Sequence, residues 1–171
     1  ESTPFAALNG FFAWRGVLNQ YTGALAMGVM SLAIILAVRT RWLEGPLDGL
    51  DKMYRLHKWL GIAGLTLAVT HWLLAKGTKW MVGWGWLERP KRGPRPPLEP
   101  GSLEQIFAQQ RGLAESVGEW AFYAAAVLMI LALIKWFPYR RFMQTHKWIA
   151  VAYLVLVFHS VVLVKFAYWS Q

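Results

Sequence analysis

The sequence predicts an all-α membrane protein, a bundle of four transmembrane helices in a single domain over residues 1–171. Two features of the composition support this fold class. First, 56% of the 171 residues are hydrophobic and the mean hydropathy is +0.32, whereas a soluble domain is roughly 45–50% apolar even when Gly is counted. Second, the chain has 11 Trp, and several lie near the ends of the apolar stretches, where amphipathic rings settle at the lipid headgroups.

Four apolar stretches without charged side chains are long enough to cross a bilayer. A helix needs roughly 20 mainly apolar residues to span about 30 Å of hydrocarbon, and Lys or Arg at its ends can extend to the interface. We therefore expect spans over about 16–38, 57–75, 119–137 and 146–167. The second and fourth stretches lack a polar face, which argues against a soluble helical bundle.

The charges separate the two sides of the membrane. The chain has 18 Lys and Arg against 9 Asp and Glu, a net charge of +9. In a soluble protein this excess would suggest nucleic-acid binding; here the charges flank apolar stretches, so we expect the lipid bilayer and no nucleic acid as the partner. Basic residues are densest in the connections 39–58 and 135–147, which places these connections in the cytoplasm. The second and fourth helices then run outward, parallel to each other, in a multi-pass protein of the plasma membrane.

The longest connection, residues 76–118, is expected on the outside. Its residues 102–116 have the pattern of an amphipathic helix with Ser102 as the N-cap,. We expect this helix to lie on the membrane face as a lid.

The four histidines carry the predicted chemistry. His57, His71, His146 and His159 all fall in the second and fourth stretches, two in each. An ionisable residue inside a membrane helix indicates a functional site, because an unpaired polar group there is costly. The chain has no Cys, which excludes disulfides, Cys-ligated zinc, iron–sulfur clusters and covalent c-type haem.

The spacing of the histidines predicts two pairs between the helices. His57 and His71 are 14 residues apart, about 21 Å along a helix and about 40° short of four turns. His146 and His159 are 13 residues apart, about 19.5 Å, but about 140° short of four turns. We expect His57 to face His146 on the inside and His71 to face His159 on the outside. Since no Pro or Gly lies between His146 and His159, a 3₁₀ tightening or a π-type widening should distort the fourth helix.

Two facing imidazoles can hold a haem iron from both sides, so two stacked haems between the second and fourth helices are expected. Other metals are disfavoured because the four uncharged apolar stretches offer no Asp or Glu as ligands, and Met27 and Met30 are interpreted as packing residues. Structural or proton-relay histidines stay as the alternative. Basic residues at the inner end are candidates for haem propionates or are ordinary cytoplasmic flanks: Arg55, Lys58, Lys147, Arg140 and Arg141. No side chain is assigned a catalytic role.

Three segments carry a resemblance to a known family. HKWLGIAGLTLAVTH from His57 to His71, HKWIAVAYLVLVFH from His146 to His159 and LDKMYRLHKWL from Leu50 to Leu60 resemble the ferric reductase and NADPH oxidase transmembrane domain, most of all its bacterial ferric reductase-like members. The resemblance extends over about Tyr21 to Tyr168. It implies a six-helix domain of which this chain supplies a four-helix core, two b-type haems, and electrons passing from NAD(P)H through FAD to an acceptor outside.

The resemblance also implies a function. The chain has no G-x-G-x-x-G fingerprint,, so FAD and NAD(P)H are expected on a missing domain or a separate flavin reductase partner. We expect an oxidoreductase of the bacterial inner membrane that passes electrons outward, with a ferric chelate as the favoured acceptor. The alternatives are oxygen reduction to superoxide, a noncatalytic cytochrome b subunit of a periplasmic reductase system, and a haem-free transporter or scaffold.

Overall fold

The structure of the protein is a computed structural model that describes residues 10–39, 44–47, 49–88 and 100–164. Its helices include α1 (Phe11–Ala37), α3 (Leu50–Gly83), α4 (Leu103–Leu133), α5 (Tyr139–His146) and α6 (Ile149–Leu163). Within the described residues, four helical units are long and apolar enough to cross a membrane, and α5 with α6 forms the fourth. The predicted all-α fold with four spans is confirmed.

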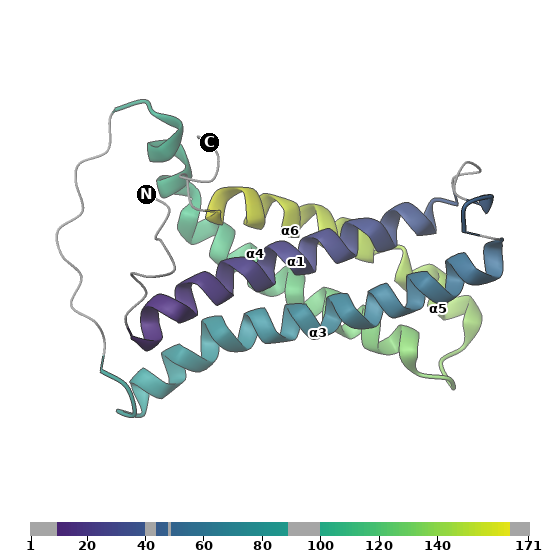
Figure 1. Ribbon diagram of the computed structural model, residues 1–171, viewed down its shortest axis with the longest axis horizontal. Coiled ribbons are helices and arrows are strands. Elements are labelled where there is room, and N and C mark those ends of the chain that lie inside the picture. Colours follow the sequence, from purple (N-terminus) through teal and green to yellow (C-terminus); the bar gives the residue numbers. More distant parts are fainter. Residues whose placement is uncertain (1–9, 40–43, 48, 89–99, 165–171) are drawn as a thin grey trace.

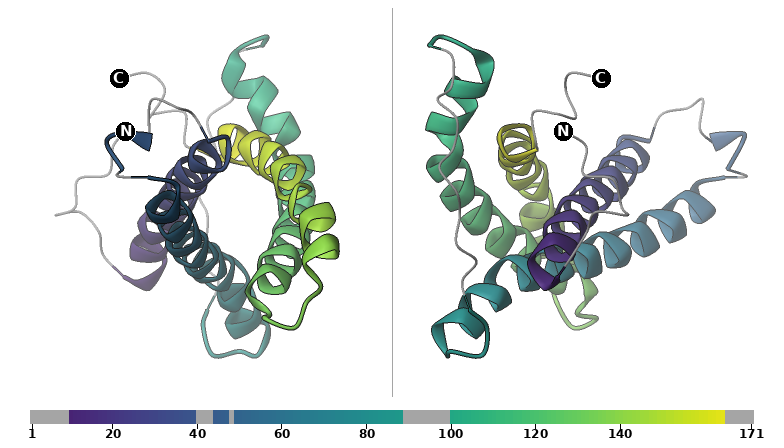
Figure 2. Two further views of the ribbon diagram at one scale, coloured as in Figure 1. Left: turned by 90° about the vertical axis from the view of Figure 1, so that its right-hand side faces the viewer. Right: turned by 60° about the vertical axis from the view of Figure 1, so that its left-hand side comes forward.

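The helices form two antiparallel hairpins (Figure 1). α1 packs along α3, and α4 packs along α6, whereas contacts between the two hairpins are sparse. Viewed along the bundle, the helices surround a central axis, with α1 and α3 on one side and α4, α5 and α6 on the other (Figure 2). The end of α1, the start of α3 and the turn from α4 to α5 lie at one end of the bundle, here named the inner end after its expected side, and the opposite end is named the outer end. The start of α4 and the end of α6 lie at the other, so α3 and α6 are parallel, as predicted.

Small side chains fill the contacts within each hairpin. The buried apolar positions include Ala26, Ala33, Ala114, Ala121, Ala125 and Ala152. A Cβ added to Gly64 of α3 would lie 3.2 Å from the side chain of Met30 in α1. Small residues are typical of helix contacts in lipid, because they let two backbones approach closely where no hydrophobic force drives association.

Arg15 ties the outer part of α1 to α3. Its Nε donates a hydrogen bond to the carbonyl oxygen of Leu74 at 2.8 Å, and its Nη2 donates to that of Ala75 at 3.2 Å. These bonds satisfy a guanidinium on a helix that crosses the membrane, where an unpaired charge would be costly.

Helices extend into both ends of the expected outer connection, residues 76–118. α3 continues to Gly83 and α4 already begins at Leu103. Lys76 ends the uncharged stretch, but a charged residue does not end a helix, and Glu119 neutralises it at 2.6 Å. The apolar stretch therefore underestimated the length of the helix.

The expected lid is not a separate helix. Ser102 is the N-cap, as predicted, since its side chain accepts a hydrogen bond from the Gln105 backbone N–H at 3.2 Å. Residues 103–116, however, are the first turns of α4 and continue without a break into the membrane span. No Pro interrupts 103–133, so nothing separates the amphipathic turns from the apolar ones.

Other boundaries differ from the expected spans. α1 and α3 begin earlier than predicted, at Phe11 and Leu50. α4 ends at Leu133 rather than at residue 137, because Pro138 follows closely and disfavours helical backbone at the residue before it,. Residues 165–167 of the expected fourth span lie outside the described part of the chain.

Candidate functional site

The four histidines form two pairs across the bundle. The ring centres of His57 and His146 are 6.0 Å apart, with the rings inclined by 75°. Those of His71 and His159 are 6.4 Å apart, inclined by 86°. Both pairs agree with the pairing predicted from the spacing.

Each pair joins the two hairpins. α3 supplies one member of each pair, and α5 with α6 supplies the other. The backbones of α3 and α6 nevertheless make few close contacts, so the imidazoles meet in the space that separates the hairpins. Since His57 and His71 are 14 residues apart on one unbroken helix, the two pairs lie about 21 Å apart along it.

The predicted distortion of the fourth helix is present directly after His146. α5 ends at His146 and α6 begins at Ile149. Across the junction, the Trp148 N–H donates to the Thr145 carbonyl at 3.0 Å and the Ala150 N–H donates to the Lys147 carbonyl at 3.2 Å. These bonds connect residues three apart, as in a 3₁₀ turn, which rotates about 120° per residue instead of about 100°. The tightening therefore adds rotation between His146 and His159 and reduces the shortfall of about 140° from four full turns.

Helix α1 orients both histidines of α3. Nδ1 of His57 is hydrogen-bonded to the carbonyl oxygen of Ala33 at 2.8 Å. Nδ1 of His71 is hydrogen-bonded to the carbonyl oxygen of Asn19 at 2.9 Å. A carbonyl acceptor requires that Nδ1 carry the proton, so Nε2 is the free lone-pair atom of each ring.

The two histidines of the other hairpin differ from each other. Nδ1 of His159 is hydrogen-bonded to the carbonyl oxygen of Ala114 in α4 at 2.8 Å. Nδ1 of His146 is buried and has no hydrogen-bond partner among the described residues. The ring of His146 instead packs against Phe142, with the ring centres 4.8 Å apart. Three of the four rings are therefore fixed by a backbone carbonyl of their own hairpin, and His146 is not.

Glycines make room for the outer pair. A Cβ on Gly118 would overlap with the imidazole of His159, and a Cβ on Gly23 would lie 3.1 Å from that of His71. Both glycines lie on the helix that packs beside the histidine, α4 for His159 and α1 for His71. The prediction from sequence did not identify either glycine or the carbonyl acceptors, because these depend on which helices pack together.

The geometry of both pairs suits axial coordination of a metal. Two metal–imidazole bonds of about 2 Å each, plus about 1 Å from each nitrogen to the centre of its ring, separate the ring centres by about 6 Å. The observed separations, 6.0 and 6.4 Å, fit this value. Among the described residues, no group of three or more His, Cys, Asp or Glu side chains could hold a metal ion. Two imidazoles at this separation could hold a haem iron, whose other four ligands belong to the porphyrin.

The predicted propionate ligands lie at the inner end of the bundle. Arg55, Lys58 and Lys147 are all exposed. Arg55 precedes His57 by two residues, about 200° around the helix, so it starts from the opposite face of α3. Lys58 and Lys147 each follow a paired histidine directly. Contact of these side chains with propionates stays a prediction.

A polar network that the sequence did not reveal joins the hairpins at the outer end. Lys76 Nζ lies 2.6 Å from Glu119 Oε2. The Tyr123 hydroxyl donates to Glu119 Oε1 at 2.6 Å, and the Trp72 indole N–H donates to the Tyr123 oxygen at 3.3 Å. Lys76 and Glu119 bound the predicted outer loop, so their pairing appears only once the helices are placed side by side.

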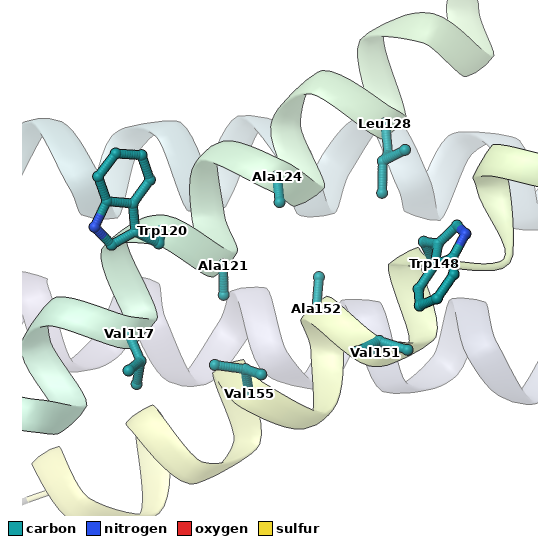
Figure 3. A pocket seen from close by; sticks show the side chains of 9 residues that line it. All are labelled: Val117, Trp120, Ala121, Ala124, Leu128, Trp148, Val151, Ala152 and Val155. Carbon is teal, nitrogen blue, oxygen red and sulfur yellow. The ribbon is translucent and has the colours of Figure 1, made fainter.

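An apolar groove of about 410 Å³ lies between α4 and α6 (Figure 3). Trp120 and Trp148 flank it, and none of the four histidines lines it. The groove is therefore separate from the histidine pairs. Its lining is Val117, Trp120, Ala121, Ala124, Leu128, Trp148, Val151, Ala152 and Val155.

Comparison with known proteins identifies the family. The family model described as ferric reductase like transmembrane component matches residues 22–157, a range that holds three of the histidines and ends two residues before His159. Searches of curated proteins and of solved structures found no match. The matched range covers most of the chain, and membership suggests an oxidoreductase-related role in transmembrane electron transfer. The chain belongs to the ferric reductase-like transmembrane family.

Proposed function

We propose that the protein transfers electrons across the membrane through two b-type haems, one held by His57 and His146 and the other by His71 and His159. The observation that carries this proposal is the repetition of one geometry at two levels. Each pair has the separation that axial coordination requires, and each takes one imidazole from each hairpin. Structural histidines would not need to oppose each other at this distance twice.

Backbone hydrogen bonds orient three of the four histidines as neutral ligands. A haem iron would supply the one-electron redox chemistry at each level. The carbonyls of Ala33, Asn19 and Ala114 fix the Nδ1 tautomer of three rings and orient Nε2 as the ligand atom,. A hydrogen bond from the N–H opposite the ligand atom also raises the basicity of the imidazole, which strengthens the metal bond.

The direction of transfer follows from the order of the pairs. The basic connections 39–58 and 135–147 support an orientation with the His57 and His146 pair near the cytoplasm and the His71 and His159 pair near the outside. With the cell interior negative, the free energy of an electron falls by about 2.3 kcal/mol per 100 mV of membrane potential when it crosses the membrane outward. We place the protein in the bacterial inner membrane, with a ferric chelate as acceptor. The donor is a flavin reductase domain or subunit that uses NAD(P)H.

Haem stoichiometry tests the proposal directly. Four axial histidines at two per haem give about two noncovalent haems per chain, measured by pyridine haemochrome absorption against protein mass. His71→Ala and His159→Ala should each remove the outer haem and spare the inner one, while His57→Ala and His146→Ala should do the reverse. One haem or none in the wild-type protein contradicts the proposal. Equal loss of both haems in all four variants contradicts it as well and indicates histidines that support folding.

A further inference from the structure

The inner histidine pair is held less firmly than the outer pair. Within the part of the chain that the structure describes, His146 is the one paired histidine whose Nδ1 lacks a hydrogen-bond partner, and it directly precedes the break between α5 and α6. The outer pair has a carbonyl acceptor for both rings and a neighbouring salt bridge between the hairpins. Some other contact has to fix the inner pair if its separation matters.

Tyr153 supplies such a contact. Its hydroxyl lies 2.6 Å from Ser31 Oγ, joining α6 to α1. Ser31 donates its own proton to the carbonyl of Met27 at 2.7 Å. Since a serine hydroxyl has one proton, Tyr153 is the donor in the bond between the two side chains.

The position of this bond relates it to the inner pair. Ser31 is two residues from Ala33, whose carbonyl accepts the hydrogen bond from His57, so it lies about 3 Å along α1 from that acceptor. Tyr153 follows His146 by seven residues, about 10 Å along the fourth helix, and lies beyond the tightened turn at Lys147 and Trp148. The bond therefore connects the residues beside one member of the pair to the helix that continues from the other.

No second tie of this kind exists at this level within the described residues. The other polar side-chain contacts between the hairpins join Gln20 to the Leu163 carbonyl, Trp72 to Tyr123 and Lys76 to Glu119, and all lie toward the outer end. Apolar packing between the hairpins is sparse. Among the described residues, the hydrogen bond of Tyr153 is therefore the polar side-chain tie between the hairpins that lies nearest the inner pair.

We propose that Tyr153 is a positioning residue, which through Ser31 holds His146 at the ligand distance from His57. The proposal deepens the proposed function and rests on it for the identity of the metal group. It assigns no electron-carrying role to the phenol ring. Tyr153→Phe keeps the ring and removes only the donor, and Ser31→Ala removes the acceptor.

The first test measures ligation in the purified full-length chain. Tyr153→Phe and Ser31→Ala should each convert part of the inner haem from low spin to high spin in the electron paramagnetic resonance spectrum. Each should speed release of that haem about three- to tenfold, the range expected for one hydrogen bond between membrane helices. The inner haem is identified as the signal lost in His146→Ala. The double variant should behave as either single one, because both changes break the same bond.

Tyr123→Phe is the matched control. It also removes a tyrosine hydroxyl that is hydrogen-bonded, but at the outer end, and it should leave the inner haem as in the wild type. The proposal is overturned if Tyr153→Phe leaves the inner haem unchanged, if its effect falls on the outer haem, or if the effects of Tyr153→Phe and Ser31→Ala add in the double variant.

A second measurement does not depend on haem and so separates this inference from the proposed function. Because the chain has no Cys, spin labels can be placed at Ile35→Cys in α1 and Met143→Cys in α5, both exposed. In haem-free protein, Tyr153→Phe should broaden the distribution of distances between these labels. A pair within one hairpin, Ile35→Cys with Leu56→Cys, should not change. Equal distributions between the hairpins with and without the Tyr153 hydroxyl overturn the positioning role, whether or not the wild type binds haem.

Discussion

Gly118 of α4 lies against the imidazole of His159 so closely that a Cβ at position 118 would overlap with the ring. The same imidazole is hydrogen-bonded to the carbonyl of Ala114, one turn earlier in α4. One helix therefore provides both the acceptor that orients His159 and the space that its ring occupies.

Gly118→Ala should displace His159 and weaken or abolish the outer haem. The added methyl cannot be accommodated without moving the ring or the helix, a kind of overpacking that costs about 1–3 kcal/mol. The measurement is haem content per chain, together with the absorption spectrum of the remaining haem. Gly112→Ala on the same helix is the control, because a Cβ there meets nothing within 4 Å. Full retention of both haems in Gly118→Ala would show that the ring has another position to adopt.

The histidine pairs could be predicted because they depend on one-dimensional quantities. Intervals of 14 and 13 residues, together with the alternation of charge that sets helix direction, were enough to place His57 opposite His146 and His71 opposite His159. The 13-residue interval also predicted a distortion of the fourth helix, since a regular helix would turn the second ring away, but it did not show that the distortion is a tightening at Lys147 and Trp148.

The surroundings of the pairs could not be predicted in the same way. Which carbonyl oxygen accepts the hydrogen bond of a histidine depends on how α1 and α4 are rotated about their own axes. The apolar pattern of a lipid-facing helix does not determine this rotation. The helix ends were missed for a related reason. A hydropathy pattern ends an apolar stretch at the first charged residue. Lys76 and Glu119 nevertheless lie within helices, because they neutralise each other.

The orientation of the bundle can be tested with single cysteines. Trp86→Cys, which follows α3 and is 71% exposed, should react with a membrane-impermeant thiol reagent applied from outside. Tyr139→Cys, at the other end of the bundle and 74% exposed, should react only after the membrane is opened. This pattern is expected because basic connections stay in the cytoplasm. The opposite pattern would reverse the topology and the proposed direction of electron transfer.

Glu119→Gln should weaken the outer tie between the hairpins. The amide keeps an acceptor for the Tyr123 hydroxyl but removes the charge that faces Lys76 at 2.6 Å. Since both side chains are part-exposed, the loss should be at most about 1 kcal/mol, measured as thermal stability in detergent. Glu115→Gln is the matched control, because its 3.2 Å pair with Arg111 is more exposed and lies within one helix. An equal effect of the two variants would mean that the Lys76 pair adds no stability to the contact between the hairpins.

Inserting one Ala between Tyr153 and Leu154 should remove the outer haem and retain the inner one. The insertion restores a 14-residue interval from His146 to His159, but it rotates all that follows by about 100° and shifts it by about 1.5 Å. His159 would then leave both the Ala114 carbonyl and the space beside Gly118. His146, Tyr153 and the tightened turn precede the insertion and stay in place.

Haem content and the resolved redox potentials of the variant measure this outcome. The control is an Ala inserted between Gly85 and Trp86, after the end of α3, where a connection absorbs an extra residue at little cost. If the tightening at Lys147 and Trp148 is what turns His159 toward His71, then a 14-residue interval made by the insertion cannot restore that orientation. Two haems in the Tyr153 insertion variant would show instead that the fourth helix adjusts its rotation freely, and that the 3₁₀ turn does not set the position of His159.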